Sequence, residues 1–203
     1  MAEVVVLVEG IHKAVSDKVV SVGSTSTLIK SDRAVLVDPG AFVNQHQLIE
    51  ALGREGLKIT DIDSVVLTHL HLDHSTNVFL FPQAKIFLRF INSNYPGQFQ
   101  KLNEGTLERF DLSKDFSVED VALIETPGHS IDHLSIVVKT QQGVVVIAGD
   151  AIPNIEWIDT QKKPNPDFVY SVEKFDESRN KILQLADFII PGHGPMFKID
   201  RTK

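Results

Sequence analysis

The sequence predicts a mixed α/β fold in which short strands follow one another along the chain and amphipathic helices pack against them. Three stretches of the first forty residues are rich in β-branched side chains and are separated by Gly, Ser and Asp turn signals, which is typical of strands. They span residues 4–13, 19–30 and 34–40, and we expect them to form a β-meander. Two further segments, residues 44–57 and 171–186, carry apolar side chains at helical spacing.

The first of these helices has signals at both ends. Asn44 is a residue type that often caps a helix N-terminus, and Gly56 is the type that most often follows a helix end. Between them, Leu48, Ile49 and Leu52 fall on one face. We therefore expect one amphipathic helix with its apolar side on the core.

Strand signals return after this helix. An apolar strand runs from residue 64 into a histidine-rich stretch that ends at residue 74. Residues rich in Asn, Gly, Gln and Pro at 92–106 predict a surface loop. Gln142-Gly143 separates two β-forming runs and predicts a hairpin. The remaining strands are expected at residues 84–90, 121–129, 134–140, 143–150 and 187–194.

Length and composition limit the class of protein. With 203 residues, of which 42% are apolar, the chain fits one domain spanning residues 1–203. Its apolar runs, such as residues 144–148, stop well short of the roughly 18 to 20 residues that a membrane helix needs, and no basic segment precedes the first apolar residues. We therefore expect a cytoplasmic protein without a membrane partner.

Charge and cysteine content narrow the chemistry. The formal net charge is −7 and the basic residues are scattered, so a small-molecule substrate is a better expectation than a broad groove for nucleic acid. The sequence contains no Cys, which excludes disulfides, thiolate ligands and a cysteine nucleophile. Any metal ion must therefore be bound through nitrogen and oxygen.

The stretch THLHLDH, residues 68–74, concentrates potential metal ligands. His69 and His71 lie two positions apart at the end of an apolar strand, and such positions project to the same side of an extended chain. The two imidazoles can therefore share one ion. Asp73 and His74 follow where the chain must turn, so they can face a second ion.

Three distant residues add to this cluster: His129 in ETPGHS, Asp150 in VVVIAGDA and His193 in IIPGHG. Each ends a predicted strand, where a rigid sheet holds the side chain at a rim that a substrate can reach. Gly precedes all three residues and lets the backbone approach a crowded centre.

These motifs, in this order, resemble those of the metallo-β-lactamase superfamily. The matching residues are Asp38 in LVDPG, followed by His69, His71, Asp73, His74, His129, Asp150 and His193. The resemblance implies a four-layer αββα sandwich with the site at one edge. It further implies that His69, His71 and His129 hold one ion, that Asp73, His74 and His193 hold a second, and that Asp150 bridges the two.

Such a centre would bind two divalent ions, with zinc as the default and iron or manganese as alternatives. The implied activity is hydrolysis of an ester, lactone, thioester or amide by a metal-bridging hydroxide. Asp73 is the candidate catalytic residue, since a carboxylate oxygen not bound to metal could pass the proton onward. Asp38 is expected behind the ligands, where it would accept a hydrogen bond from an imidazole and fix its tautomer.

Other functions stay open. The second half of the chain, including ESRNKILQLADFIIPGHGPMFKI, is similar to a subgroup whose animal members are associated with cleavage of histone pre-mRNA, which implies a phosphodiesterase or ribonuclease as an alternative. A mononuclear iron dioxygenase of the persulfide type and a non-catalytic binding module are two more. Asp150 is followed by AIPN without a tyrosine, so the arrangement typical of quorum-signal lactonases is not reproduced.

The remaining histidines and aromatic residues have less specific expectations. His12 and His46 are expected to have structural or surface roles, and His133 a structural hydrogen-bonding role. Trp157 and Tyr170 lie between Asp150 and the last helix. A lid or pocket wall, core packing, and a contact in a homodimer are the alternatives for this pair.

Overall fold

The computed structural model describes residues 1–89 and 116–201. Most of the described strands belong to two five-stranded sheets. The first sheet has the order β1-β4-β5-β6-β7, with β1 (Glu3–Val8), β4 (Ser26–Lys30), β5 (Ala34–Val37), β6 (Ser64–Val66) and β7 (Lys85–Phe87). The second has the order β12-β11-β10-β9-β8, with β8 (Val121–Glu125), β9 (Leu134–Thr140), β10 (Gly143–Gly149), β11 (Phe188–Pro191) and β12 (Phe197–Lys198).

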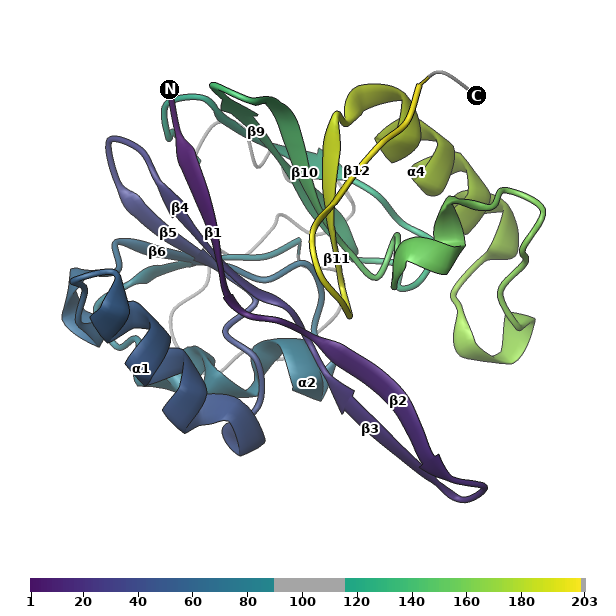
Figure 1. Ribbon diagram of the computed structural model, residues 1–203, viewed down its shortest axis with the longest axis horizontal. Coiled ribbons are helices and arrows are strands. Elements are labelled where there is room, and N and C mark those ends of the chain that lie inside the picture. The colour runs from purple at the N-terminus through teal and green to yellow at the C-terminus, as the bar shows by residue number, and fades with distance from the viewer. Residues whose placement is uncertain (90–115, 202–203) are drawn as a thin grey trace, which may run out of the picture.

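The two sheets face each other, with α1 (Gln45–Arg54) outside the first and α4 (Val172–Leu185) outside the second (Figure 1). Alternation along the strands builds these layers, because successive side chains point to opposite faces of a sheet. Val66 packs between the sheets while Val65 packs toward α1. In β10, Val145 packs between the sheets and Val146 packs toward α4. The four-layer αββα sandwich that the motifs implied is confirmed.

Parallel strand pairs fix where the candidate residues lie. β5 and β6 are parallel, as are β10 and β11, and parallel strands end at the same edge of their sheet. The loops that follow these strands therefore emerge together, and α2 (Leu72–Ser75) forms in the loop after β6. Short 3₁₀ segments lie at Phe42–Asn44, Ile59–Asp61, Thr76–Leu80, Ile155–Ile158 and Pro166–Phe168.

The expected β-meander is wrong for residues 11–23. There β2 (Ile11–Ser16) and β3 (Val19–Gly23) pair with each other as a hairpin that projects from the body, while β1 pairs with β4 (Figure 1). The chain at the base of the hairpin is held by the second sheet instead, since the backbone N–H of Thr25 donates to the carbonyl of Gly192 at 2.7 Å. Local strand propensity carries no signal for a contact between residues so distant in sequence.

The predicted helices and the predicted hairpin are confirmed. α1 begins after Asn44, and Gly56, with a φ of +75°, follows its end. Asn44 does not cap the helix with its side chain, however, because its Oδ1 accepts a hydrogen bond from the backbone N–H of Ala41 at 2.9 Å. α4 is capped by Ser171, and β9 and β10 pair as a hairpin whose turn is Gln141-Gln142, one residue earlier than predicted.

The strand expected over residues 64–74 is shorter than predicted. It ends at Val66, and a turn leads into α2 at Leu72. The surface loop expected at residues 92–106 lies outside the described residues. Within the described residues, 1–89 and 116–201, none of the helices combines the length and the apolar character needed to cross a membrane.

Candidate metal centre

The structure brings all seven predicted ligands together at one edge of the sandwich. They form two groups, and within each group the potential ligand atoms lie within 4.8 Å of one another. The first group is His69, His71, His129 and Asp150, and the second is Asp73, His74 and His193. The division matches the two ligand sets that the family resemblance implied, with Asp150 assigned to the first group.

Every one of these residues follows the end of a strand or lies in α2. His69 and His71 follow β6, and Asp73 and His74 lie in α2. The second sheet supplies the other three, which follow β8, β10 and β11: His129, Asp150 and His193. The two facing sheets therefore each provide part of both groups, which fixes the groups relative to each other.

Asp150 lies between the two groups with one carboxylate oxygen toward each. Its Oδ2 is 3.2 Å from His129 Nε2 and 3.9 Å from His69 Nε2. Its Oδ1 is 3.2 Å from His193 Nε2 and 3.5 Å from His74 Nε2. This arrangement allows one carboxylate to contact a cation in either group.

The remaining two ligands complete the groups from the solvent side. His71 Nδ1 lies 3.0 Å from His129 Nε2. Asp73 Oδ2 lies 3.7 Å from both His74 Nε2 and His193 Nε2, and its side chain is 23% exposed. The centre is thus closed by the sheets and open past His71 and Asp73.

Hydrogen bonds behind the ligands fix which imidazole nitrogen faces the centre. Asp38 Oδ2 lies 2.8 Å from His74 Nδ1, and its two oxygens also accept from the backbone N–H and hydroxyl of Thr68. Since the Thr68 hydroxyl donates to Asp38, it accepts from His69 Nδ1 at 3.0 Å. In their neutral forms both imidazoles therefore carry their proton on Nδ1 and present Nε2. Asp38 lies where the sequence placed it.

Several supporting groups could not be found from the sequence. His193 Nδ1 donates to the carbonyl of Gly23 at 2.9 Å, and Ser24 Oγ donates to the carbonyl of Asp73 at 2.7 Å. His12, expected to be structural or on the surface, has its exposed ring 5.9 Å from that of His193. The base of the hairpin thus forms one wall of the centre. A backbone carbonyl has no sequence signature, so only Thr68, inside THLHLDH, could have been noticed.

Burial and charge shift the pKa values of the central groups in opposite directions. Burial alone would lower the pKa of His74, but the carboxylates of Asp150 and Asp38 outweigh it and raise that pKa well above its usual value. Burial would raise the pKa of Asp150, but His74 and His193 hold it well below its usual value. Burial lowers the pKa of His69. Asp150 is therefore a carboxylate and His69 a neutral imidazole.

The residues fit a divalent metal ion. The buried polar side-chain atoms of the described residues that have no hydrogen-bond partner include His69 Nε2, His74 Nε2 and Asp150 Oδ1. Such atoms are costly unless something binds them, and all three face the same centre. Imidazole nitrogen and carboxylate oxygen suit zinc, iron and manganese alike.

Trp157 and Tyr170, whose roles the sequence left open, lie in different surroundings. Trp157 packs on Phe175 with ring centroids 5.3 Å apart, so it belongs to the core beneath α4. Tyr170 is exposed, and its backbone N–H donates to the carbonyl of His129 at 3.2 Å. Beside it lies a hollow of about 510 Å³ that is also lined by Ile131. Tyr170 is therefore part of a pocket wall next to the turn that carries His129.

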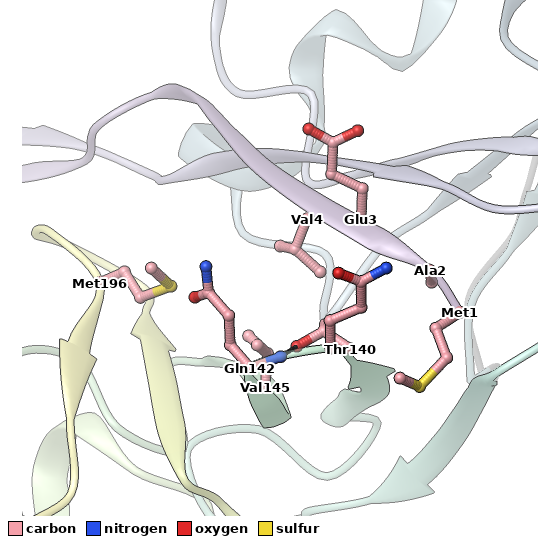
Figure 2. Close-up of a pocket in the computed structure, with 9 residues that line it drawn as sticks. Met1, Ala2, Glu3, Val4, Thr140, Gln142, Val145 and Met196 are labelled. Atoms are coloured by element: carbon pink, nitrogen blue, oxygen red, sulfur yellow. Dashed lines mark hydrogen bonds between the residues drawn. The ribbon is translucent and has the colours of Figure 1, made fainter.

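A second cavity is remote from the centre. It has a volume of about 500 Å³ and lies between the start of β1 and the turn joining β9 to β10, with Met1, Thr140, Gln142 and Met196 around it (Figure 2). Asp150 follows the opposite end of the seven-residue strand β10, roughly 20 Å away. None of the predicted ligands lines this cavity.

An αββα sandwich whose strand-end loops gather histidines and carboxylates at one edge is the architecture of a metal-dependent enzyme. Comparison with known families agrees with the geometry. The family model described as "Metallo-beta-lactamase superfamily" matches residues 20–193, and the chain belongs to this superfamily.

Similar proteins and structures support the assignment. Metallo-beta-lactamase domain-containing protein 1 of Xenopus laevis is 31% identical over 96% of this chain and 80% of its own length. A crystal structure from Thermotoga maritima, described as a metallo-beta-lactamase, has a TM-score of 0.72 at 24% identity and covers 98% of this chain and 99% of its own. A quorum-quenching N-acyl homoserine lactone lactonase has a TM-score of 0.64 at 21% identity, covering 95% and 91%. At these identities the two structures establish the fold.

Metal binding should release protons and strengthen as the pH rises. The pKa values of His74 and His193 are raised in the metal-free chain, so these imidazoles keep a proton at pH values where a free histidine has lost it. A cation needs their lone pairs and must displace those protons. Calorimetric titration with zinc in buffers of different ionisation enthalpy should show proton release, and affinity should increase through the raised pKa values. Affinity that is independent of pH would contradict this account.

Replacing Asp38 by Asn should weaken metal binding about 10- to 100-fold, because the charged acceptor that fixes the His74 tautomer is lost. Asn tolerates the left-handed backbone at this position, where φ is +49°, so the fold should persist. Metal competition with a chromophoric chelator measures the change. Asp187→Asn is the matched control, since Asp187 accepts a backbone hydrogen bond from Val144 far from the centre. Equal losses in both variants would contradict the assigned role.

Proposed function

We propose that this chain is a dinuclear metal-dependent hydrolase that cleaves an ester, lactone, thioester or amide bond in a small molecule. The observation that carries the proposal is the position of Asp150, because each of its carboxylate oxygens faces a different group of imidazoles. Oδ2 approaches His129 and Oδ1 approaches His193, each at 3.2 Å. A carboxylate in this position can serve two ions at once.

Two divalent ions, with zinc as our first expectation, would supply Lewis acidity and a water whose pKa is lowered toward about 7. We assign the first ion to His69, His71 and His129 and the second to Asp73, His74 and His193, with Asp150 shared. The chain contributes fixed ligand orientations. Since Asp38, Thr68 and the Gly23 carbonyl already hold the Nδ1 atoms, the imidazoles need not reorient when a substrate binds.

Asp73 is the residue that we propose moves the proton. Its side chain is 23% exposed, compared with 8% for Asp150, so it is the carboxylate of the centre that can exchange protons with solvent. It also lies beside His74 and His193 in the second group. A proton released on hydrolysis would pass to its carboxylate and then to solvent.

The second group of ligands favours this function over that of a mononuclear iron dioxygenase. A single-ion enzyme needs only one group. Here His74 and His193 each have their own hydrogen-bond acceptor behind them, the Asp38 carboxylate and the Gly23 carbonyl. Support of this kind is what metal-ligating imidazoles require.

The structure has a hollow of small-molecule size next to the centre. The hollow beside the His129 turn has about 510 Å³, which lies within the roughly 300–1,000 Å³ typical of small-ligand sites, and it adjoins the ligands without being lined by them. The net charge of −7 disfavours a nucleic acid. The similar fold of a lactonase makes a lactone one member of the substrate panel, although AIPN after Asp150 lacks the tyrosine expected of such enzymes.

The function is tested with chelated, metal-free protein reloaded with zinc, iron or manganese and assayed against a panel. Aryl esters, lactones, thioesters and nitrocefin represent acyl transfer, bis-nitrophenyl phosphate and RNA represent phosphodiesters, and glutathione persulfide with oxygen represents the dioxygenase. We expect turnover of an acyl substrate that is lost on chelation, restored by metal, lost in His193→Ala and retained in His46→Ala, whose side chain is exposed. Turnover of phosphodiesters alone, or of persulfide with one iron per chain, would replace the proposed function.

Replacing Asp73 by Asn should lower kcat about 100-fold at equal metal content, because the proton acceptor is lost while a ligand oxygen remains. The dependence of kcat on pH and the solvent isotope effect should change with it. Asp167→Asn, at an exposed position outside the centre, is the control. An unchanged pH profile and isotope effect at full metal occupancy would show that Asp73 is only a ligand.

A further inference from the structure

His133 is the one fully buried histidine near the centre that belongs to neither ligand group. Its ring centroid lies 5.1 Å from that of His69, with the planes inclined by 32°. One of its ring nitrogens accepts a hydrogen bond from a backbone N–H, so that nitrogen carries no proton and the ring is neutral. A neutral imidazole has one nitrogen that donates and one that accepts, and the surrounding atoms decide which is which.

The donors and acceptors around His133 allow a single arrangement. The backbone N–H of Asp150 can only donate, and it donates to His133 Nε2 at 3.0 Å. The proton of His133 is therefore on Nδ1, which lies 2.9 Å from Thr126 Oγ1. Thr126 then donates to Ser135 Oγ at 2.8 Å, and Ser135 donates to the carbonyl of Ala148 at 2.9 Å. We call this chain of hydrogen bonds, from Asp150 N to Ala148 O, the His133 relay.

The two ends of the His133 relay are backbone groups of the residues on either side of Gly149. Ala148 precedes it and Asp150 follows it, and Gly149 has a φ of +53°, in the left-handed region. A Cβ at Gly149 would lie 2.9 Å from His133 Nε2, so the ring is packed directly against this turn. It is this left-handed residue that turns the chain out of β10 and sets the direction of the Asp150 side chain.

We propose that His133 is a positioning residue for the bridging carboxylate: it fixes the backbone of Asp150 so that the two carboxylate oxygens face the two ligand groups. The proposal rests on the proposed dinuclear function, because that is what requires the orientation. His133 is not a metal ligand in this account, since its Nε2 lone pair is already used by the Asp150 N–H. It acts through Asp150 and makes no contact with the substrate.

Three variants separate positioning from simple packing. His133→Leu keeps the approximate volume but leaves the Asp150 N–H without an acceptor. His133→Gln supplies an amide oxygen close to the position of Nε2 and should restore that acceptor. Ile136→Val perturbs β9, the strand that follows His133, at a side chain that is buried between the sheets and does not belong to the His133 relay.

The readout is the affinity of the folded protein for zinc, measured by competition, together with the number of ions bound. His133→Leu should lose at least tenfold in affinity, His133→Gln should recover most of it, and Ile136→Val should match the wild type. A zinc affinity of His133→Leu that agrees with the wild-type affinity within about twofold would overturn the proposal.

Histidine nitrogen NMR of the zinc-loaded wild type gives a second, independent readout. His133 should show a protonated, slowly exchanging Nδ1 and a bare Nε2, and Thr126→Val should perturb this resonance. A proton on Nε2 would overturn the proposal even where the Leu variant fails to fold. A wild-type chain that takes up only one ion would contradict the dinuclear function, while the NMR result and the affinity for that one ion still decide the role of His133.

Discussion

The carboxylate of Asp150, buried between two groups of imidazoles, is the interaction on which the rest of the centre depends. Its negative charge in a buried site is tolerated because His74 and His193, whose pKa values are raised, approach its Oδ1 at 3.5 and 3.2 Å. An unpaired carboxylate at this depth would take up a proton, and a histidine cluster without the carboxylate would offer a cation no negative charge. The charge of Asp150 and the ligand geometry therefore require each other.

The fold places this carboxylate by topology and not by local sequence. Asp150 follows β10, and its neighbours come from strands that are parallel to β10 or lie in the facing sheet. Behind the ligands stands a layer of hydrogen-bond acceptors that includes Asp38, Thr68 and the Gly23 carbonyl. The centre therefore has the features of a preorganised metal site: a rigid core lies beneath the ligands, polar acceptors surround them, and buried nitrogen and oxygen atoms without partners face the centre.

Local patterns predict most of the helices and strands and mark the residues that the structure brings together, whereas the four-layer arrangement was implied by the family resemblance. Runs of β-forming residues marked β9 and β10 closely, and THLHLDH marked a cluster that the structure gathers in space. Prediction from the sequence fails where the decisive contact joins residues that are far apart along the chain. The Gly23 carbonyl that holds His193 is 170 positions away, and the separation of β2 and β3 from the first sheet depends on contacts of the same kind. Neither strand propensity nor motif spacing encodes such contacts.

Anomalous X-ray diffraction at the metal absorption edge, on crystals of protein loaded without excess metal, tests the central claim most directly. The account predicts two peaks per chain, one on each side of the Asp150 carboxylate and roughly 3.5 to 4 Å apart. A single peak per chain, or two peaks of which neither contacts Asp150, would contradict it.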